Sequence, residues 1–393
     1  MNAKPLHALH VVEATTAGVR RYVSALVVGL RARGMDIAVA APWRRSQHYG
    51  DTAFVEDLRQ EGAPFYPLPM QRRIGLRDGV VLVALWRLLR RERFALVHTH
   101  SSKGGFLGRI AAGICNLPAI HTPNGLYFLE KAGASRQFYL NLERMAGRFT
   151  TTLIAVSEDE KSVLMQNKVV DAARIRVIHN GIDVARIDGE AQLTKMEAKS
   201  RLGIRPDRRV VGVVGRLVPQ KDPLAFVQAA RRVADEAPGA LFVWVGSGPL
   251  RAEVESQAKA KDVPVRILGH REDVWKVMRA FDVFVLPSQY EGLPFALLEA
   301  MALSLPVVAT NVVGIRDVIE DEATGLIVPA KAPAAMTKAV LSLFRDPQWA
   351  DGLAAAARQK VVAEFSLEQM LDRHQMLYEE VYARHARSRA PGE

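Results

Sequence analysis

Several features of common protein classes are scarce or missing in this sequence. Cys115 is the only cysteine among 393 residues, so no internal disulfide can form and a reducing compartment is expected. No apolar run approaches the roughly 18 residues that a membrane-spanning helix needs, and the best stretch, from Gly79, is interrupted at Arg87. The N-terminal residues lack the apolar core of a signal peptide. These absences predict a cytoplasmic protein without a spanning helix.

The composition does not indicate a disordered or fibrous chain. Hydrophobic residues make up 49% of the sequence and charged residues 24%, close to the average of globular proteins. Disorder, collagen-like repeats and coiled coils are therefore poor fits to this composition. At roughly 150 residues per domain, the length favours two domains.

Acidic residues are scarce in the first half of the chain only. Residues 1–180 contain 25 Lys and Arg against 14 Asp and Glu, whereas residues 181–393 contain 28 of each. This excess predicts an anionic partner, either a phospholipid surface or a phosphorylated acceptor, although a solvated face is the simpler alternative. Nucleic acid ranks lower, because zinc-ligand spacing and RNA-binding aromatic motifs are absent from the sequence. The basic clusters comprise Arg72, Arg73, Arg77, Arg87, Arg90, Arg91 and Arg93.

Short β-branched runs alternate with helix-period stretches along the whole chain, a pattern typical of parallel sheets covered by helices. In such sheets ligands bind beyond the carboxyl ends of the strands, so two sheets predict a cleft lined by strand-to-helix loops. The expected strands are residues 6–12, 36–40, 95–100, 119–122 and 151–157 in the first half, and 209–217, 240–246, 265–269, 282–287, 306–310 and 325–329 in the second.

The domain boundary is expected after a turn signal at Asn180 and Gly181, where a polar stretch reaching to about residue 190 is typical of a linker. This predicts an N-terminal domain over residues 1–180, a C-terminal domain over 181–365 and a final helix over 366–393. The final helix is amphipathic and is expected to pack back toward the N-terminal domain. Its apolar face comprises Leu367, Met370, Leu371, His374, Leu377, Tyr378 and Val381.

Two loops of the second half carry residues suited to a phosphorylated ligand. Arg216 and Lys221 follow its first strand, and an Arg fork with a mobile Lys can stabilise the charge of a nucleoside diphosphate. Glu291 lies in a later loop, and Glu299 lies one turn into a helix that Pro294 is expected to begin. The start of this helix can hold an anion, and the Glu299 carboxylate can accept hydrogen bonds from two ribose hydroxyls. Each residue alone is as easily a surface side chain, so the prediction depends on the set.

The motifs of both halves, taken in order, carry a family resemblance. EGLPFALLEAMA, which contains Glu291 and Glu299, is preceded by GRLVPQKD, VGSGPL and ILGHRED and followed by GIRDVIEDEATGLIVP. The first half contains HVVEATTAGVRRYV, LVHTHSSKGGFLGRIAA, LIAVSE and VIHNGID. This set resembles the retaining family 4 glycosyltransferases of GT-B fold and covers nearly the whole chain. The resemblance implies an α/β protein of two facing Rossmann-like domains with a cleft between them and a C-terminal crossover helix.

The resemblance also implies roles for individual residues. His121 matches a family histidine near the donor sugar and, with Glu291, Arg216 and Lys221, would form the catalytic set; a structural histidine is the alternative. The donor would contact Gly18, Arg216, Lys221, Arg266, Leu268, Glu291, Gly292, Leu293, Pro294, Phe295 and Glu299. The acceptor would contact Lys103, Asn124, Arg72 and Arg73.

Three positions depart from the family pattern. Ala17 precedes Gly18 where paired glycines are usual, which is expected to narrow the approach of a phosphate. Ser247 replaces a common acidic residue, with little expected effect. Asn124 stands where many members have a second histidine, so histidine-based roles fall on His121.

Metal ligands are also scarce. The Asp-x-Asp pattern of metal-dependent glycosyltransferases is absent from the sequence, so two cations and a helix end would replace the metal, and no cofactor is expected. His98 and His100 alternate onto one side of a strand, but no third ligand is evident in the sequence near them. We therefore expect no metal site.

The leading hypothesis is a retaining, metal-independent enzyme that transfers a hexosyl or N-acetylhexosaminyl group from a nucleotide sugar, with UDP favoured over GDP. Its acceptor would be a lipid-linked or other anionic saccharide of bacterial cell-surface polysaccharide synthesis, at the inner face of the cell membrane. The alternatives are a GT-B epimerase or phosphorylase and a non-catalytic basic protein that binds membrane or nucleic acid. A nicotinamide dehydrogenase is disfavoured, because EATTAGVRRY lacks the G-x-G-x-x-G phosphate loop.

Overall fold

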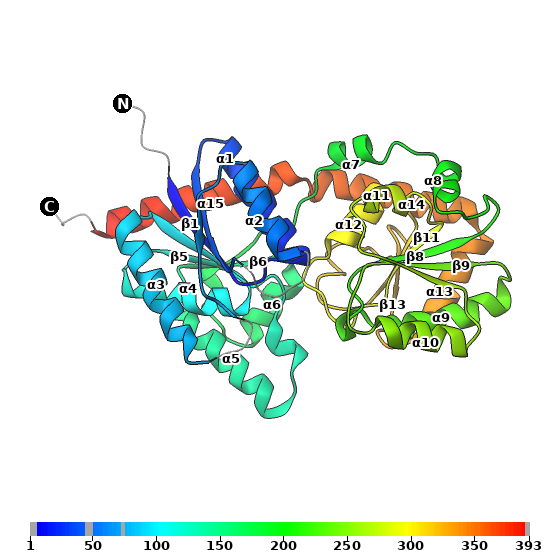
Figure 1. Ribbon diagram of the computed structural model, residues 1–393, viewed down its shortest axis with the longest axis horizontal. Helices are drawn as coiled ribbons and strands as arrows, with labels where there is room; N and C mark the ends of the chain where they lie inside the picture. The colour runs from blue at the N-terminus through cyan, green and yellow to red at the C-terminus, as the bar shows by residue number, and fades with distance from the viewer. Residues whose placement is uncertain (1–5, 44–49, 72–74, 390–393) are drawn as a thin grey trace. The chain divides into compact units, whose positions relative to one another are not determined.

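The computed structural model describes residues 6–43, 50–71 and 75–389, and the chain divides into two α/β units. Unit 1 comprises Met1–Asn180 and Leu367–Glu393, and unit 2 comprises Gly181–Ser366. Each unit contains one sheet with helices on both of its faces (Figure 1). The predicted class of two parallel-sheet α/β domains is confirmed.

The sheet of unit 1 has seven strands in the order β3-β2-β1-β4-β5-β6-β7. The two edge strands, β3 and β7, were not expected, because each is only three residues long and lacks a clear apolar run. The chain order reverses between β1 and β4, which is the switch point of this sheet. The strands are β1 His7–Val12, β2 Asp36–Ala41, β3 Phe65–Pro67, β4 Leu96–His100, β5 Ala119–Thr122, β6 Thr152–Ala155 and β7 Ile175–Val177.

Strand alternation divides the side chains of unit 1 between two faces. Leu9 and Val11 on β1 join the apolar core beneath α3 and α4, whereas His10 points to the opposite face, where Tyr378 of α15 contacts it. On that face α1 buries the apolar residues expected from its sequence period. The helices are α1 Ala17–Ala32, α2 Gly50–Gln60, α3 Arg77–Glu92, α4 Ser102–Ile114, α5 Gly133–Gly147, α6 Glu158–Gln166 and α15 Leu367–Arg389.

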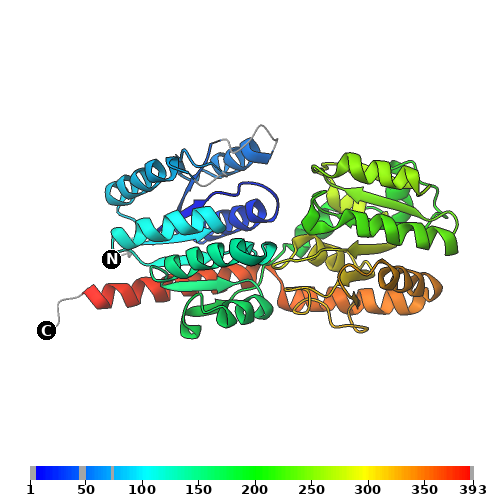
Figure 2. The same cartoon turned by 90° about the horizontal axis from the view of Figure 1, so that it is seen from below.

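The last helix, α15, packs on α1 of unit 1, and Figure 2 shows it in red, extending along this unit toward the C-terminus. Its predicted apolar face is buried from Met370 to Val381. None of the described helices has the length and apolar character that crossing a lipid bilayer requires.

The sheet of unit 2 has six strands in the order β10-β9-β8-β11-β12-β13, and all six were expected from the sequence. Its switch point lies between β8 and β11, where ligands of open parallel sheets bind. The strands are β8 Val210–Val214, β9 Leu241–Val245, β10 Val265–Gly269, β11 Val283–Leu286, β12 Val307–Thr310 and β13 Leu326–Val328.

The stretch predicted as a linker is instead helical. Its helix α7 (Val184–Glu190) begins at Asp183, whose carboxylate accepts a hydrogen bond from the Arg186 N–H, and it buries Ile187. A good N-cap and one buried apolar residue suffice here because α7 packs against α12. The other helices of unit 2 are α8 Lys195–Arg201, α9 Pro223–Glu236, α10 Arg251–Ala260, α11 Val274–Met278, α12 Phe295–Ala302, α13 Pro333–Arg345 and α14 Pro347–Glu364.

Candidate active site

The switch point of unit 2 brings together two of the predicted donor residues. Lys221 ends the 3-10 turn that follows β8, and Glu291 lies in the loop that follows β11. The Lys221 ammonium is 2.5 Å from Glu291 Oε1, and the Ser288 hydroxyl donates to the same oxygen at 2.5 Å. Both charged side chains are mostly buried, with 14% and 6% exposed. The result is a compact ion pair where a diphosphate and a sugar were expected to bind.

Further hydrogen bonds join the loops after β8 and β11. The Gln289 N–H donates to the Gln220 carbonyl at 2.8 Å, and the Gln220 side chain donates to the Tyr290 carbonyl at 3.1 Å. Gln289 also donates to the Asp222 carboxylate, which caps α9. These bonds fix the two loops relative to each other, so the ion pair sits on a rigid support.

Glu299 is completely buried on α12, one turn after the helix begins. The Trp275 indole N–H, from α11, donates to its Oε1 at 2.8 Å. Pro294 is the N-cap residue and not the first helical residue, a shift of one position, and within the described residues no side chain caps this helix. The buried Leu293 and Phe295 flank that helix start, which is a place for an anion.

Two glycines of unit 2, Gly246 and Gly314, allow their loops to approach the backbone of the loops after β8 and β11 closely. Gly246 has φ +139°, and a Cβ there would lie 2.0 Å from the Gly215 carbonyl oxygen, just before the exposed Arg216. A Cβ on Gly314, with φ +82°, would lie 1.5 Å from the Gly292 carbonyl oxygen. Only glycine allows these two approaches.

Arg266 and Leu268, two of the predicted donor residues, lie on β10, an edge strand of the sheet. Its pairing with β9 shifts register between Ile267 and Gly269, so Leu268 lies in a β-bulge. The Arg266 guanidinium donates to the Leu202 carbonyl at 3.0 Å and is thereby held beside the end of α8. Within the described residues, β10 therefore pairs with β9 alone.

In unit 1, His121 is fully buried on β5. Its Nδ1–H donates to the Thr99 carbonyl at 3.0 Å, and its Nε2 has no hydrogen-bond partner within the described part of the chain. Burial, followed by the positive charge of Arg109, holds the His121 pKa well below 6.5. Its ring is therefore neutral, with a bare lone pair on Nε2. Gly105 of α4 is adjacent, since a Cβ there would lie 2.3 Å from the ring.

The other unit 1 candidates have varied surroundings. Gly18 is exposed in the first turn of α1, after Ala17, which adopts a left-handed φ of 53°. The Lys103 ammonium is 2.5 Å from Asp78 on α3, so it bridges α3 and α4. The Asn124 amide donates to the Thr122 carbonyl at 3.3 Å. Arg72 and Arg73 lie outside the described residues.

Unit 1 also contains a cavity of about 430 Å³ that no sequence pattern indicates. It lies between the start of α3 and the loop after β3, close in sequence to the basic residues proposed for the acceptor. Its lining comprises Trp43, Leu68, Pro69, Met70, Gln71, Arg77 and Val80.

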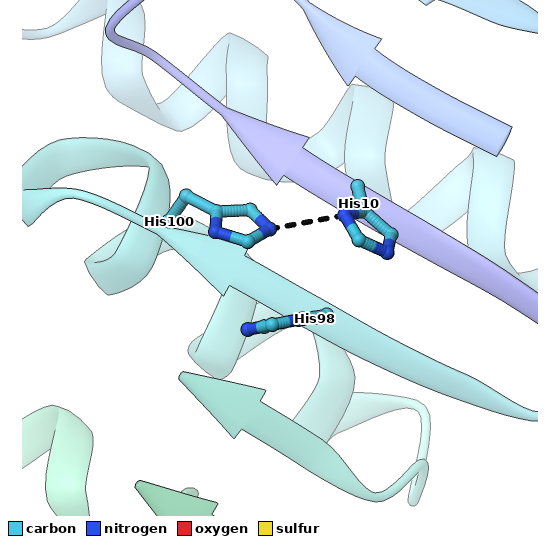
Figure 3. Close-up of side chains that lie close together, drawn as sticks. All are labelled: His10, His98 and His100. Carbon is cyan, nitrogen blue, oxygen red and sulfur yellow. Dashed lines mark hydrogen bonds between the residues drawn. The ribbon is translucent and has the colours of Figure 1, made fainter. Parts of the chain in front are cut away.

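The expectation that His98 and His100 lack a third partner is wrong. His10 on β1 pairs in register with His98 on β4, and all three histidines are completely buried (Figure 3). One nitrogen from each ring lies within 4.8 Å of the other two. The juxtaposition was missed because parallel pairing of β1 with β4 joins residues far apart in sequence.

Comparisons with known proteins agree with this architecture. Residues 16–186 match the model for Glycosyltransferase Family 4, and residues 208–346 match that for Glycosyl transferases group 1. The chain is 33% identical over 324 residues to the Escherichia coli UDP-Gal:alpha-D-GlcNAc-diphosphoundecaprenol alpha-1,3-galactosyltransferase, covering 80% of this chain and 83% of the relative. The chain therefore belongs to glycosyltransferase family 4 and is a glycosyltransferase.

One further relative and one solved structure are also similar to this chain. Alpha-maltose-1-phosphate synthase of Mycolicibacterium smegmatis is 31% identical over 311 residues, covering 74% of this chain and 80% of the relative. The crystal structure of Anabaena HepE in complex with UDP-glucose has a TM-score of 0.81 at 19% identity, covering 95% of this chain and 99% of that one. The fold is thus GT-B, as the sequence resemblance implied.

Proposed function

We propose that this enzyme transfers a hexosyl group from a UDP-sugar to a saccharide linked through diphosphate to a lipid, with retention of anomeric configuration and without a metal ion at the donor. The observation that carries this proposal is the Lys221–Glu291 pair at the switch point of unit 2, together with the buried Glu299 on α12. The E. coli relative, whose name specifies UDP-galactose and a diphosphoundecaprenol-linked acceptor, supports the choice of substrates.

The proposed step breaks the bond between the anomeric carbon and the UDP oxygen and forms a bond from that carbon to the acceptor oxygen. The acceptor proton passes to the departing diphosphate. Arg216 and Lys221 stabilise the negative charge of the diphosphate, which is the task that a metal performs elsewhere. In this proposal Glu291, whose Oε1 is held by Lys221 and Ser288, binds hydroxyls of the donor sugar and does not attack the anomeric carbon.

The transfer proposal is tested with purified enzyme, UDP-hexoses and a synthetic polyprenyl-diphosphate N-acetylglucosamine acceptor. The product should form after EDTA treatment without stimulation by Mg²⁺ or Mn²⁺, and its NMR spectrum should show the anomeric configuration of the donor. Lys221→Met should abolish turnover, whereas Lys338→Met, at an exposed position on α13, should not. An inverted product or strict dependence on Mn²⁺ would contradict the proposal. Epimerised UDP-sugar or sugar phosphate would instead indicate the epimerase or phosphorylase alternative.

We also propose that unit 1 binds an anionic membrane surface through α3. One face of this helix is buried in the core, but Val80, Val83 and Trp86 are 60%, 46% and 36% exposed. Arg87 and Arg90 are exposed beside them, and the Arg90 guanidinium lies 5.7 Å from the centre of the Trp86 ring. Exposed apolar side chains among arginines are typical of helices that lie in the headgroup region of a bilayer.

The membrane proposal is tested by cosedimentation with lipid vesicles. Binding should be strong to vesicles containing phosphatidylglycerol and weak to pure phosphatidylcholine. The double change Val83→Ser and Trp86→Ser should reduce binding several-fold, whereas Val362→Ser, an equally exposed apolar position on α14 of unit 2, should leave it unchanged. Equal binding to both vesicle types would overturn the proposal.

A further inference from the structure

Three histidines to which no role in sugar transfer was assigned are enclosed between the sheet of unit 1 and the helices α1 and α15. His10 projects from β1, and His98 and His100 project from β4 toward the same face (Figure 3). The three side chains have no solvent exposure. Their only described ring neighbours on the covering helices are Tyr22 of α1 and His374 and Tyr378 of α15.

The spacing of the rings fits a small cation. One nitrogen from each histidine lies within 4.8 Å of the other two, and His10 Nδ1 is 3.1 Å from His100 Nε2. Two nitrogens bound tetrahedrally to zinc at 2.0–2.1 Å are separated by about 3.3 Å. His10 and His100 are therefore already at the separation of two zinc ligands.

Oxygen atoms lie where the outer partners of metal-bound histidines are usually found. Such histidines donate their second N–H to an oxygen, which fixes the ring orientation. Here His10 Nε2 is 3.0 Å from the Tyr378 hydroxyl, and His98 Nε2 is 2.8 Å from the Thr122 hydroxyl. If both nitrogens donate, the lone pairs of His10 and His98 are on Nδ1. Tyr378 Oη, 2.5 Å from His98 Nδ1, adds an oxygen beside these atoms.

The hydrogen positions can be assigned along this network. His374 Nδ1 must donate to the Met370 carbonyl, so its Nε2 accepts from Tyr22, whose oxygen can then accept from Thr122. Continuing through His98, Tyr378 and His10, each described donor of the chain finds an acceptor in the metal-free protein: Tyr378 donates to His98 Nδ1, and His100 Nε2–H donates to His10 Nδ1. His100 Nδ1 remains as a buried nitrogen lone pair for which the described residues provide no partner.

We propose that His10, His98 and His100 bind one divalent transition-metal ion, with Zn²⁺ as the cation that the site fits best. Three imidazoles without a thiolate favour Zn²⁺, Cu²⁺ or Ni²⁺ over Mg²⁺ or Ca²⁺. Burial lowers the pKa of all three rings, to about 3 for His10, so the ligands are neutral at neutral pH. Zinc binding at His100 Nε2 moves the proton of that nitrogen to Nδ1 of the same ring, so the ligand stays a neutral imidazole, and the Tyr378 hydroxyl no longer donates to His98 Nδ1.

This metal would stabilise unit 1 and take no part in sugar transfer. It joins β1 to β4, and through Tyr378 it holds α15 against the sheet. The donor residues of unit 2 are not involved, so the proposal is independent of the proposed function. Because binding requires two strands that are distant in sequence to be paired as in the folded protein, it would raise the stability of unit 1.

The test measures zinc in the untagged full chain, which avoids the histidines of an affinity tag. Protein is produced with Zn²⁺, purified without chelator, and also refolded from urea with Zn²⁺, because the buried rings need an opening for entry. Inductively coupled plasma mass spectrometry should find about one zinc per wild-type chain. His98→Asn and His100→Asn should each lose it, whereas His374→Asn, in the same network but outside the three ligands, should retain it.

X-ray absorption of wild-type protein keeps the proposal testable if a histidine variant fails to fold. The zinc edge should show nitrogen and oxygen ligands at about 2.0–2.1 Å. Wild-type protein that contains no zinc after both preparations would overturn the proposal. Retention of zinc by His98→Asn and His100→Asn together would equally overturn it, because the ion would then lie elsewhere.

Discussion

At the scale of single residues, the Lys221–Glu291 pair has separate consequences for stability and for activity. Lys221→Met keeps the aliphatic stem but leaves the Glu291 carboxylate, 6% exposed, without its cation. We expect this variant to lose roughly 3 kcal/mol of unfolding free energy, because an isolated buried charge is strongly unfavourable. In Lys221→Met/Glu291→Gln both charges are gone, and most of that loss should be recovered. Urea denaturation of the wild type, Lys221→Met, Glu291→Gln and the double variant gives the coupling energy of the pair directly.

The activity of these variants should not recover in the double variant as their stability does. Both groups are proposed to act on the donor, so each single variant and the double variant should lose about 100-fold or more in kcat/KM. A double variant that regained both stability and turnover would mean that the pair is only structural. Parallel loss of stability in single and double variants would mean that the carboxylate is not stabilised by Lys221.

The same residues show how far the site could be read from sequence. Lys221, Glu291 and Glu299 were singled out because charged residues after buried strands meet at one edge of a parallel sheet. Trp275 is not identified from the sequence, although its indole N–H donates to Glu299. Its position depends on how α11 packs beside α12, which no local pattern indicates. Ser288 was missed for a related reason: a serine three residues before a loop glutamate carries no signal by itself.

At the scale of elements, close packing of α4 on the sheet depends on small residues. A Cβ on Gly108 would lie 2.6 Å from the Thr99 methyl carbon and 3.2 Å from Val11 Cβ, both on stiff β-branched side chains. Gly108→Ala should therefore destabilise unit 1 by roughly 1–3 kcal/mol, despite the higher helix propensity of alanine.

Gly79 on α3 is the matched control, since its position is exposed and no atom lies within 4 Å of a Cβ built there. Gly79→Ala should stabilise the protein by about 0.5–1 kcal/mol. Thermal unfolding of both variants tests the opposite signs. Stabilisation by both substitutions would show that α4 can move away from the sheet without loss.

The elements themselves were predicted where their apolar pattern is strong. The central strands and the face of α15 follow from continuous apolar runs and helical spacing, which burial alone dictates. The short edge strands β3 and β7 are not predicted from the sequence, because their backbone pairing needs little side-chain burial. Helix α7 is not predicted either. The turn signal at Asn180-Gly181 and the polar sequence after it favour a linker, and Ile187 is the single buried apolar residue of the helix.

At the scale of the whole molecule, buried histidines are confined to one unit. His10, His98, His100, His121 and His374 all belong to unit 1 and have no solvent exposure, whereas the only histidine of unit 2, His270, is exposed. Burial lowers the pKa of each of the five below 6.5, to about 3 for His10 and about 4 for His374. The two units should therefore respond differently to acid.

The direction in which the stability of unit 1 changes with pH follows from proton binding. Below pH 6.5 the unfolded chain takes up protons that folded unit 1 excludes, so stability is full above pH 6.5 and falls as the pH is lowered toward 4. Each such histidine contributes on the order of 1 kcal/mol per pH unit in that range. Hydrogen exchange of the metal-free protein, followed by mass spectrometry of peptides from both units, should show protection lost in unit 1 first. Equal loss of protection in both units between pH 6.5 and 5 would show that carboxylates, which both units contain, dominate acid unfolding instead.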